Sequence, residues 1–105
     1  MIDPASPMGE DIQPSICSFA KRVGRLPQVI AVTCARENDT HRIWAFIRER
    51  DKLVRRHVYQ EELRLMEEAP DTSFDFNVVA LDRVEFHSFL ADDLQGRILF
   101  YRDHR

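Results

Sequence analysis

The sequence has little that would staple, anchor or export a protein. Its 105 residues include two cysteines, three glycines and five prolines, which excludes a disulfide scaffold, a collagen-like repeat and a low-complexity chain. The longest unbroken apolar run is Ile43–Ile47, far short of the roughly 20 residues that a transmembrane helix needs. The first residues lack the basic and apolar regions of a secretory signal. We therefore expect a cytoplasmic protein without a membrane anchor.

A strong excess of charge of one sign is also missing. The formal net charge is −3 and the isoelectric point is about 5.8, which disfavours a general nucleic-acid coat or a basic membrane-surface peptide. Arginine supplies most of the cations, and its planar guanidinium suits carboxylates and phosphates. With 44% hydrophobic residues, the chain is long enough to fold around a core of its own.

No motif of catalysis or metal binding stands out. Neither Cys17 nor Cys34 lies in a CxxC pair, and both fall within apolar patterns, which predicts buried free thiols. The four histidines form no HxH or HExxH motif, and no serine lies in GxSxG. The sequence therefore predicts no catalytic residue, no metal site and no cofactor.

The chain divides into a flexible tail at residues 1–10 and a single α+β domain at residues 11–105. Within the domain, helical and strand periodicities alternate. The elements, in the order α-β-β-α-β-α-β, are expected at residues 11–23, 28–35, 42–49, 51–68, 73–81, 83–90 and 97–102. Turn residues at 37–40 favour an antiparallel hairpin between the first two strands. The simplest architecture is a two-layer sandwich, in which a four-stranded mixed sheet carries two main helices and one short helix.

Residues at the helix ends and on the helix faces carry further expectations. Asp11 would cap the first helix, and Gly24 would end it in a left-handed conformation. Asp51 would cap the long helix. The apolar side chains of that helix predict one broad buried stripe, formed by Val54, Val58, Tyr59, Leu63, Leu65 and Met66.

The strands carry apolar side chains on both faces. In residues 42–49, Ile43 and Ile47 point to one side, and Trp44 and Phe46 point to the other. Two helices cannot cover both faces of four strands, so the second face needs another cover. The alternatives are the first helix, a second copy or other protein, and a nucleic acid that stacks on the aromatics. The residues expected to anchor a homodimer or a protein partner are Trp44, Phe46, Arg48 and Tyr101.

Charge on the long helix runs against the helix dipole. Lys52, Arg55 and Arg56 lie in its first turns, and Glu67 and Glu68 lie in its last. Each such exposed charge costs roughly 0.3–1 kcal/mol at low salt. Two interpretations stay open: a solvated helix laced with ion pairs, or charge kept for recognition. In the second, a basic edge and an acidic edge would fix the register of a two-fold dimer.

Four arginines offer an alternative site for an anion. The guanidinium groups that could hold a phosphate or a nucleotide are those of Arg48, Arg50, Arg55 and Arg56. No glycine-rich loop accompanies them, so the pattern of a phosphate-binding loop is missing. This alternative predicts a small-molecule ligand, with Asp75 or His57 as candidate chemistry.

Asp75 and Asn77 alternate on the strand at 73–81, so they project from one side. They could hold a divalent ion, or Asp75 could pair with an arginine. The element order resembles that of a minimal nucleotidyltransferase domain. That family carries Gly-Ser after the first strand and Asp-x-Asp on the second, whereas this chain has ARE at 35–37 and RIWAFIRE at 42–49. The resemblance therefore implies a catalytically inactive relative.

The sequence as a whole favours a small cytoplasmic domain that acts by protein binding or homodimerisation, without catalysis. The second choice is an anion- or nucleotide-binding domain. A nucleic-acid binder comes third, because the acidic composition weighs against it.

Overall fold

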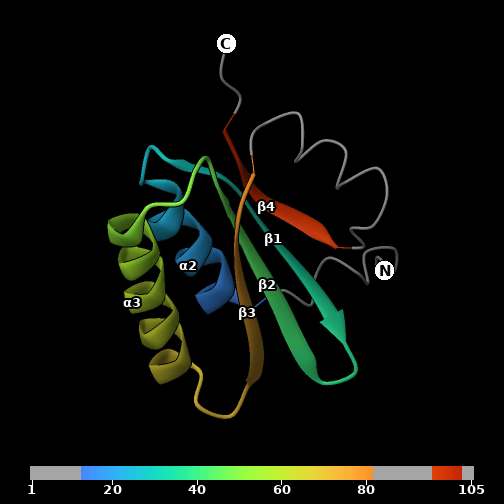
Figure 1. Ribbon diagram of the computed structural model, residues 1–105. Helices are drawn as coiled ribbons and strands as arrows, with labels where there is room; N and C mark the ends of the chain where they lie inside the picture. The colour runs from blue at the N-terminus through green and yellow to red at the C-terminus, as the bar shows by residue number, and fades with distance from the viewer. Residues whose placement is uncertain (1–12, 82–95, 103–105) are drawn as a thin grey trace.

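The computed structural model describes residues 13–81 and 96–102 (Figure 1). These residues form α2 (Pro14–Gly24), β1 (Val29–Glu37), β2 (Thr40–Ile47), α3 (Lys52–Glu68), β3 (Ser73–Ala80) and β4 (Arg97–Tyr101). All of these elements were predicted, in this order. The predicted tail at residues 1–10 and the predicted short helix at residues 83–90 lie outside the described residues.

The four strands form one mixed sheet in the order β3-β2-β1-β4. The strand β1 pairs antiparallel with both β2 and β4, and β2 pairs parallel with β3 through the crossover that contains α3. The predicted hairpin and the predicted mixed sheet are therefore confirmed. The hairpin turns at Asn38, whose φ of 58° lies in the left-handed region that asparagine tolerates better than most residues.

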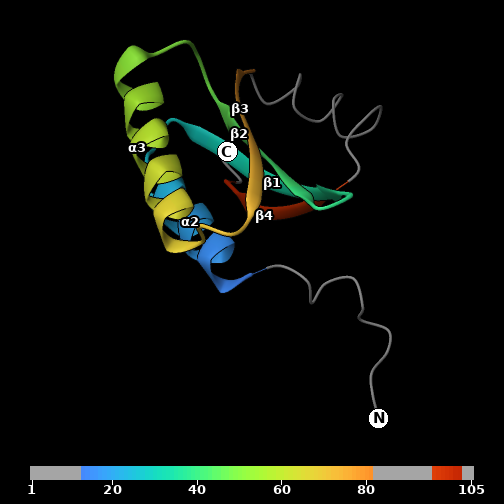
Figure 2. The same ribbon diagram turned by 90° about the horizontal axis from the view of Figure 1, so that it is seen from below.

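Both helices cover the same face of the sheet, which makes the molecule a two-layer α+β sandwich (Figure 2). Helix α2 packs over β1 and β4, whereas α3 lies beside α2 and contacts β3. The alternative in which the first helix covers the second face is therefore wrong.

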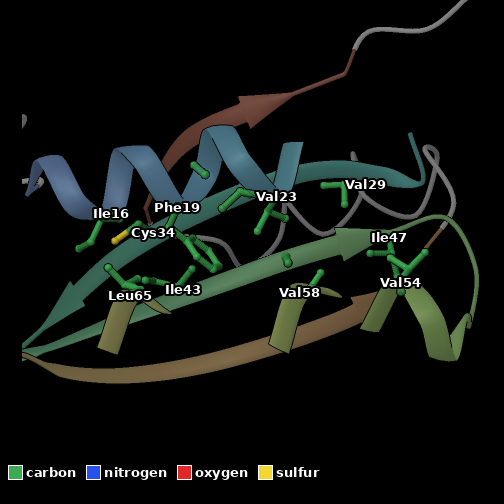
Figure 3. Packing of buried hydrophobic residues seen from close by; sticks show 13 residues of the cluster. Ile16, Phe19, Val23, Val29, Cys34, Ile43, Ile47, Val54, Val58 and Leu65 are labelled. Carbon is green, nitrogen blue, oxygen red and sulfur yellow. The ribbon is translucent and has the colours of Figure 1, made fainter. Parts of the chain in front are cut away.

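The main core fills the space between the helices and the sheet (Figure 3). Helix α2 contributes Ile16, Phe19 and Val23, all of which are fully buried. The opposing residues are apolar side chains of α3, β1 and β2, namely Val54, Val58, Leu65, Val29, Val32, Cys34, Ile43, Ala45 and Ile47. This single continuous core accounts for the two-layer arrangement without any covalent staple.

The first helix ends differently from the prediction. Gln13 precedes it without a side-chain cap, and the expected cap Asp11 lies outside the described residues. No glycine in the described parts of the chain has a positive φ, so Gly24 does not supply a left-handed turn. A Cβ atom on Gly24 would instead lie 2.6 Å from Cδ1 of Phe100. Glycine is needed here because the ring of Phe100 packs against the helix backbone.

A second contact ties the end of β4 to the connection between α2 and β1. The guanidinium of Arg102 donates hydrogen bonds to the carbonyl oxygens of Val29 (3.1 Å), Leu26 (3.1 Å) and Gly24. The same group lies 5.1 Å from the centre of the Phe100 ring, over its face. The edge of the sheet at β4 is thus held by one charged side chain that satisfies three backbone carbonyls.

Candidate interaction surface

Helix α3 carries apolar side chains on two sides. Val54, Val58 and Leu65 are buried in the core, as predicted. By contrast, Tyr59, Leu63 and Met66 are 57%, 40% and 38% exposed, so the prediction of one broad buried stripe is wrong for these three. At about 100° per residue, they lie about 100–160° around the helix axis from the centre of the buried side. The core is therefore too narrow to reach them.

Ion pairs between α2 and α3 show which flank of α3 faces α2 and which faces β3. The guanidinium Nε of Arg22 donates to Glu61 Oε1 at 2.6 Å, and Arg22 also lies 3.8 Å from a carboxylate oxygen of Glu68. These contacts turn the flank that carries Glu61 and Glu68 towards α2. The helical rotation then places Tyr59 and Met66 on the opposite flank, which is the side of β3. The exposed apolar atoms of α3 consequently adjoin the edge of the sheet.

The strand β3 leaves its inward side chains incompletely covered. Phe74, Phe76 and Val78 face the helices but are only half-buried. Their neighbours on β2, Ile43 opposite Phe76 and Ala45 opposite Val78, are 1% exposed. In the part of the chain that the structure describes, β2 is the only strand that pairs with β3. The outer edge of β3 therefore presents backbone donors and acceptors beside half-buried apolar side chains.

We call the exposed side chains Tyr59, Leu63 and Met66, together with the outer edge of β3, the α3–β3 surface. Beneath it lies Glu62, whose helical position falls between the core side and the β3 flank and which is 7% exposed. Burial raises the pKa of the Glu62 carboxyl to about 7. The surface is therefore underlain by an acid that titrates near neutral pH.

Charge divides the α3–β3 surface into two halves. Lys52 and Arg55 lie at its N-terminal end, and Glu67 lies exposed at its C-terminal end. Helix α3 has no acidic residue in its first turn and no basic residue in its last turn. Within α3, Arg64 Nε donates to Glu68 at 3.3 Å, whereas Glu61 pairs with Arg22 of α2. Intrahelical pairing thus leaves the charges at the two ends of the helix unexplained.

The predicted interface residues lie on the second face of the sheet, and the structure assigns them different roles. Phe46 is fully buried together with Ile30 and Ala31, so it has no atoms to offer a partner. The ring of Trp44 stacks on Phe46 with centroids 6.0 Å apart, and Trp44 is half-buried. Tyr101 is also half-buried and packs against the same cluster. Phe46 therefore packs beside Trp44 within the cluster and is not itself available to a partner.

Arg48 lies past the end of β2, and it is exposed, as are the other three arginines of the predicted anion site. Those four residues, Arg48, Arg50, Arg55 and Arg56, surround the start of α3. The carboxylate of Asp51 accepts hydrogen bonds from the backbone N–H groups of Leu53 (2.9 Å) and Val54 (3.2 Å), as the predicted cap should. Because Asp51 already occupies these donors, an anion would meet a carboxylate at the N-terminus of the helix.

Asp75 has an arginine partner. Its carboxylate accepts from Arg42 Nε at 3.2 Å, and Arg42 also donates to Glu37 at 3.1 Å. Of the two alternatives for Asp75, this ion pair is the one that the structure shows. The other candidate for chemistry, His57, is exposed on α3.

The thiols and the buried histidine have apolar surroundings. Cys34 is buried, and this burial raises the pKa of its thiol to about 11, whereas Cys17 is exposed, contrary to the prediction. His41 packs against Phe74 with ring centroids 6.0 Å apart, and burial followed by the charge of Arg36 lowers its pKa. Over residues 13–81 and 96–102, no three His, Cys, Asp or Glu side chains are grouped so that they could hold a metal ion.

Comparison with known proteins adds no relative, because no protein-family model and no curated protein matches the chain. Neither α2 nor α3 is long and apolar enough to cross a membrane, and no other helix occurs in the described residues. The geometry of the chain is therefore the basis for the function proposed below.

Sequence reasoning missed three features of the α3–β3 surface: the buried Glu62, the separate exposed apolar arc and the edge position of β3. Glu62 lies four residues after Val58 and three before Leu65, and this spacing places it on the core side of the helix. The positions of Tyr59, Leu63 and Met66 form a second apolar arc on α3. The rotation of about 100° per residue separates this arc from the core side of the helix. Which strand lies at the edge depends on the strand order, and the sequence does not provide that order.

Proposed function

We propose that this chain is a non-catalytic protein-binding domain and that it binds through the α3–β3 surface. The observation that carries the proposal is the grouping of Tyr59, Leu63 and Met66, all exposed, beside an edge strand of eight residues. Single exposed apolar residues are common on proteins and mean little, whereas grouped ones mark interaction sites. An adjacent strand edge adds main-chain hydrogen bonds to the same contact.

The charges on α3 support the same proposal. A partner that offers acidic groups near Lys52 and basic groups near Glu67 would bind in one orientation only. Charges that oppose the helix dipole are unfavourable in the isolated domain. Opposite charges on a partner would make these charges favourable in the complex, which pairing within the helix does not do.

The second face of the sheet is the weaker candidate for the contact. Its central residues, Ala31 and Phe46, are fully buried, so a partner would reach only the half-buried rims of Trp44 and Tyr101. The helical surface exposes far more of its aromatic ring, since Tyr59 is 57% exposed.

A photo-reactive amino acid at position 59 tests the proposal in the source cells. The matched control places the same group at Leu53, which is 69% exposed and lies about 120° around α3 from Tyr59. Irradiation should give a protein adduct from position 59, including an adduct with a second copy, and none from position 53. Absence of adducts from both positions, or equal labelling of both, would contradict the proposal.

A further inference from the structure

We infer that the partner at the α3–β3 surface is a second copy of this chain, which pairs edge to edge along β3. The inference rests on the proposed function, because it identifies the protein that this surface binds. A two-fold axis perpendicular to the sheet would pair the two β3 strands antiparallel and join the two sheets into one. The two α3 helices would then lie side by side and antiparallel on the same face of the joined sheet.

The lengths of α3 and β3 are similar, so one two-fold axis can pass through the middle of both the helix pair and the strand pair. Helix α3 has 17 residues and is about 25 Å long at 1.5 Å per residue. Strand β3 has eight residues and is about 26 Å long at 3.3 Å per residue. The helix connects directly to the strand and runs back along it, so their midpoints, near Gln60 and Asn77, lie at a similar height. An axis through Asn77 therefore passes close to Tyr59.

Antiparallel placement of α3 makes the two charged halves complementary. With the axis near Tyr59, Lys52 of one copy lies opposite Glu67 of the other, and symmetry repeats the contact. The apolar side chain of Tyr59 lies nearest the axis, where it meets its own counterpart. The charges that oppose the helix dipole within one chain thus become favourable between two chains.

The strand is self-complementary about the same axis. In an antiparallel pair centred on Asn77, Phe76 lies opposite Val78 and Asp75 lies opposite Val79. No like charges face each other. Because the chain supplies both halves of each contact, a second copy fits this surface without any further assumption about a partner.

Charge reversal at the ends of α3 separates this dimer from any other. The measurement is sedimentation equilibrium of the full chain over a range of concentrations, for the wild type, Lys52→Glu, Glu67→Lys and the double variant. Wild-type protein should approach twice the mass of the 12.4 kDa chain. Each single reversal puts like charges together twice, so the dissociation constant should rise by about tenfold. The double variant restores opposite charges and should return to within about threefold of the wild type.

Two controls distinguish a loss of dimerisation from a loss of folding. Each reversal gives the helix end the charge that its dipole favours, so the thermal stability of the monomeric domain should rise or stay unchanged while dimerisation weakens. The variant Arg97→Glu, a charge reversal on β4 at the opposite edge of the sheet, should dimerise like the wild type. A loss of dimer that follows a loss of folding would contradict the inference.

Three other outcomes would overturn it: a monomer at every concentration, a dimer that ignores both reversals, or a double variant weaker than either single one. The cross-link at position 59 distinguishes failure of self-pairing from failure of the proposed binding surface. A monomeric chain whose position 59 captures a different protein overturns self-pairing and leaves the proposed binding surface in place. A monomeric chain with no adduct at position 59 overturns both.

Discussion

The strands β3 and β4 form the two edges of one sheet, but they end it in different ways. Strand β4 has five residues, its register against β1 shifts between Val32 and Thr33, and Arg102 ties its end to three carbonyl groups. Strand β3 has eight residues in continuous register with β2. Short and irregular strands are a common way to prevent pairing at an edge. The β4 edge is therefore short and irregular, which disfavours pairing with a further strand, whereas the β3 edge retains the regularity that pairing needs.

The largest effect is expected at the β4 edge. Arg102→Met removes the donors that satisfy the carbonyls of Gly24, Leu26 and Val29, and should lower the free energy of unfolding by about 3 kcal/mol. The matched control is Arg97→Met, an exposed arginine on the same strand, which should change stability by less than about 0.5 kcal/mol. Urea unfolding of both variants measures the difference. Equal effects would show that Arg102 does not hold this edge.

The acid beneath the α3–β3 surface should make stability depend on pH. The folded Glu62 carboxyl, with a pKa near 7, holds its proton more tightly than an unfolded one with a pKa of 4.5. Stability contributed by this group is therefore fully present below pH 4.5 and is lost as the pH rises through 7. Glu62→Gln should remove this loss and stabilise the domain by about 1–3 kcal/mol above pH 7.

Unfolding of the Glu62→Gln variant at pH 4.5 and pH 8 provides the measurement. The exposed Glu67→Gln on the same helix is the control and should keep the wild-type pH dependence. A glutamine variant that loses stability in parallel with the wild type would show that Glu62 is not the group that titrates.

A moderate effect is expected at the start of α3. Asp51→Ala removes the acceptor for the N–H groups of Leu53 and Val54 and should lower the free energy of unfolding by about 1 kcal/mol.

Thermal unfolding in phosphate tests the arginine cluster, because Asp51 competes with an anion for these donors in the wild type. We expect no shift of the wild-type melting temperature in phosphate. A clear upward shift would favour the anion-binding alternative.

The smallest effect is expected on the exposed second-face side of β3. Asp75→Asn breaks a pair with Arg42 in which both side chains are more than a third exposed, so stability should change by less than about 0.5 kcal/mol. Differential scanning calorimetry would detect a larger loss of stability as a lower melting temperature. A loss of several degrees in melting temperature would mean that Asp75 does more than pair with Arg42.

Much of the fold could be predicted from the sequence because it depends on local signals. The turn residues at 37–40 and the capping carboxylate of Asp51 act over a few positions, and both lie where predicted. The parallel pair follows from the long helix between two strands. These features need no knowledge of distant neighbours.

The candidate site could be predicted only in part, because it depends on which elements lie beside α3. Periodicity identified Tyr59, Leu63 and Met66 as apolar but could not show that the core ends before reaching them. The aromatic residue Phe46 suited an interface by its type, yet its burial depends on the tertiary structure around it. Likewise, Gly24 is explained by the ring of Phe100, a residue distant in the sequence.

Hydrogen–deuterium exchange of the full chain, at low and at high protein concentration, compares the two edges directly. We predict that exchange slows with concentration over β3 and over residues 59–66 of α3, while β4 exchanges at the same rate in both samples. Concentration-independent exchange over β3, or protection that appears at β4 instead, would contradict the pairing of two copies at the α3–β3 surface.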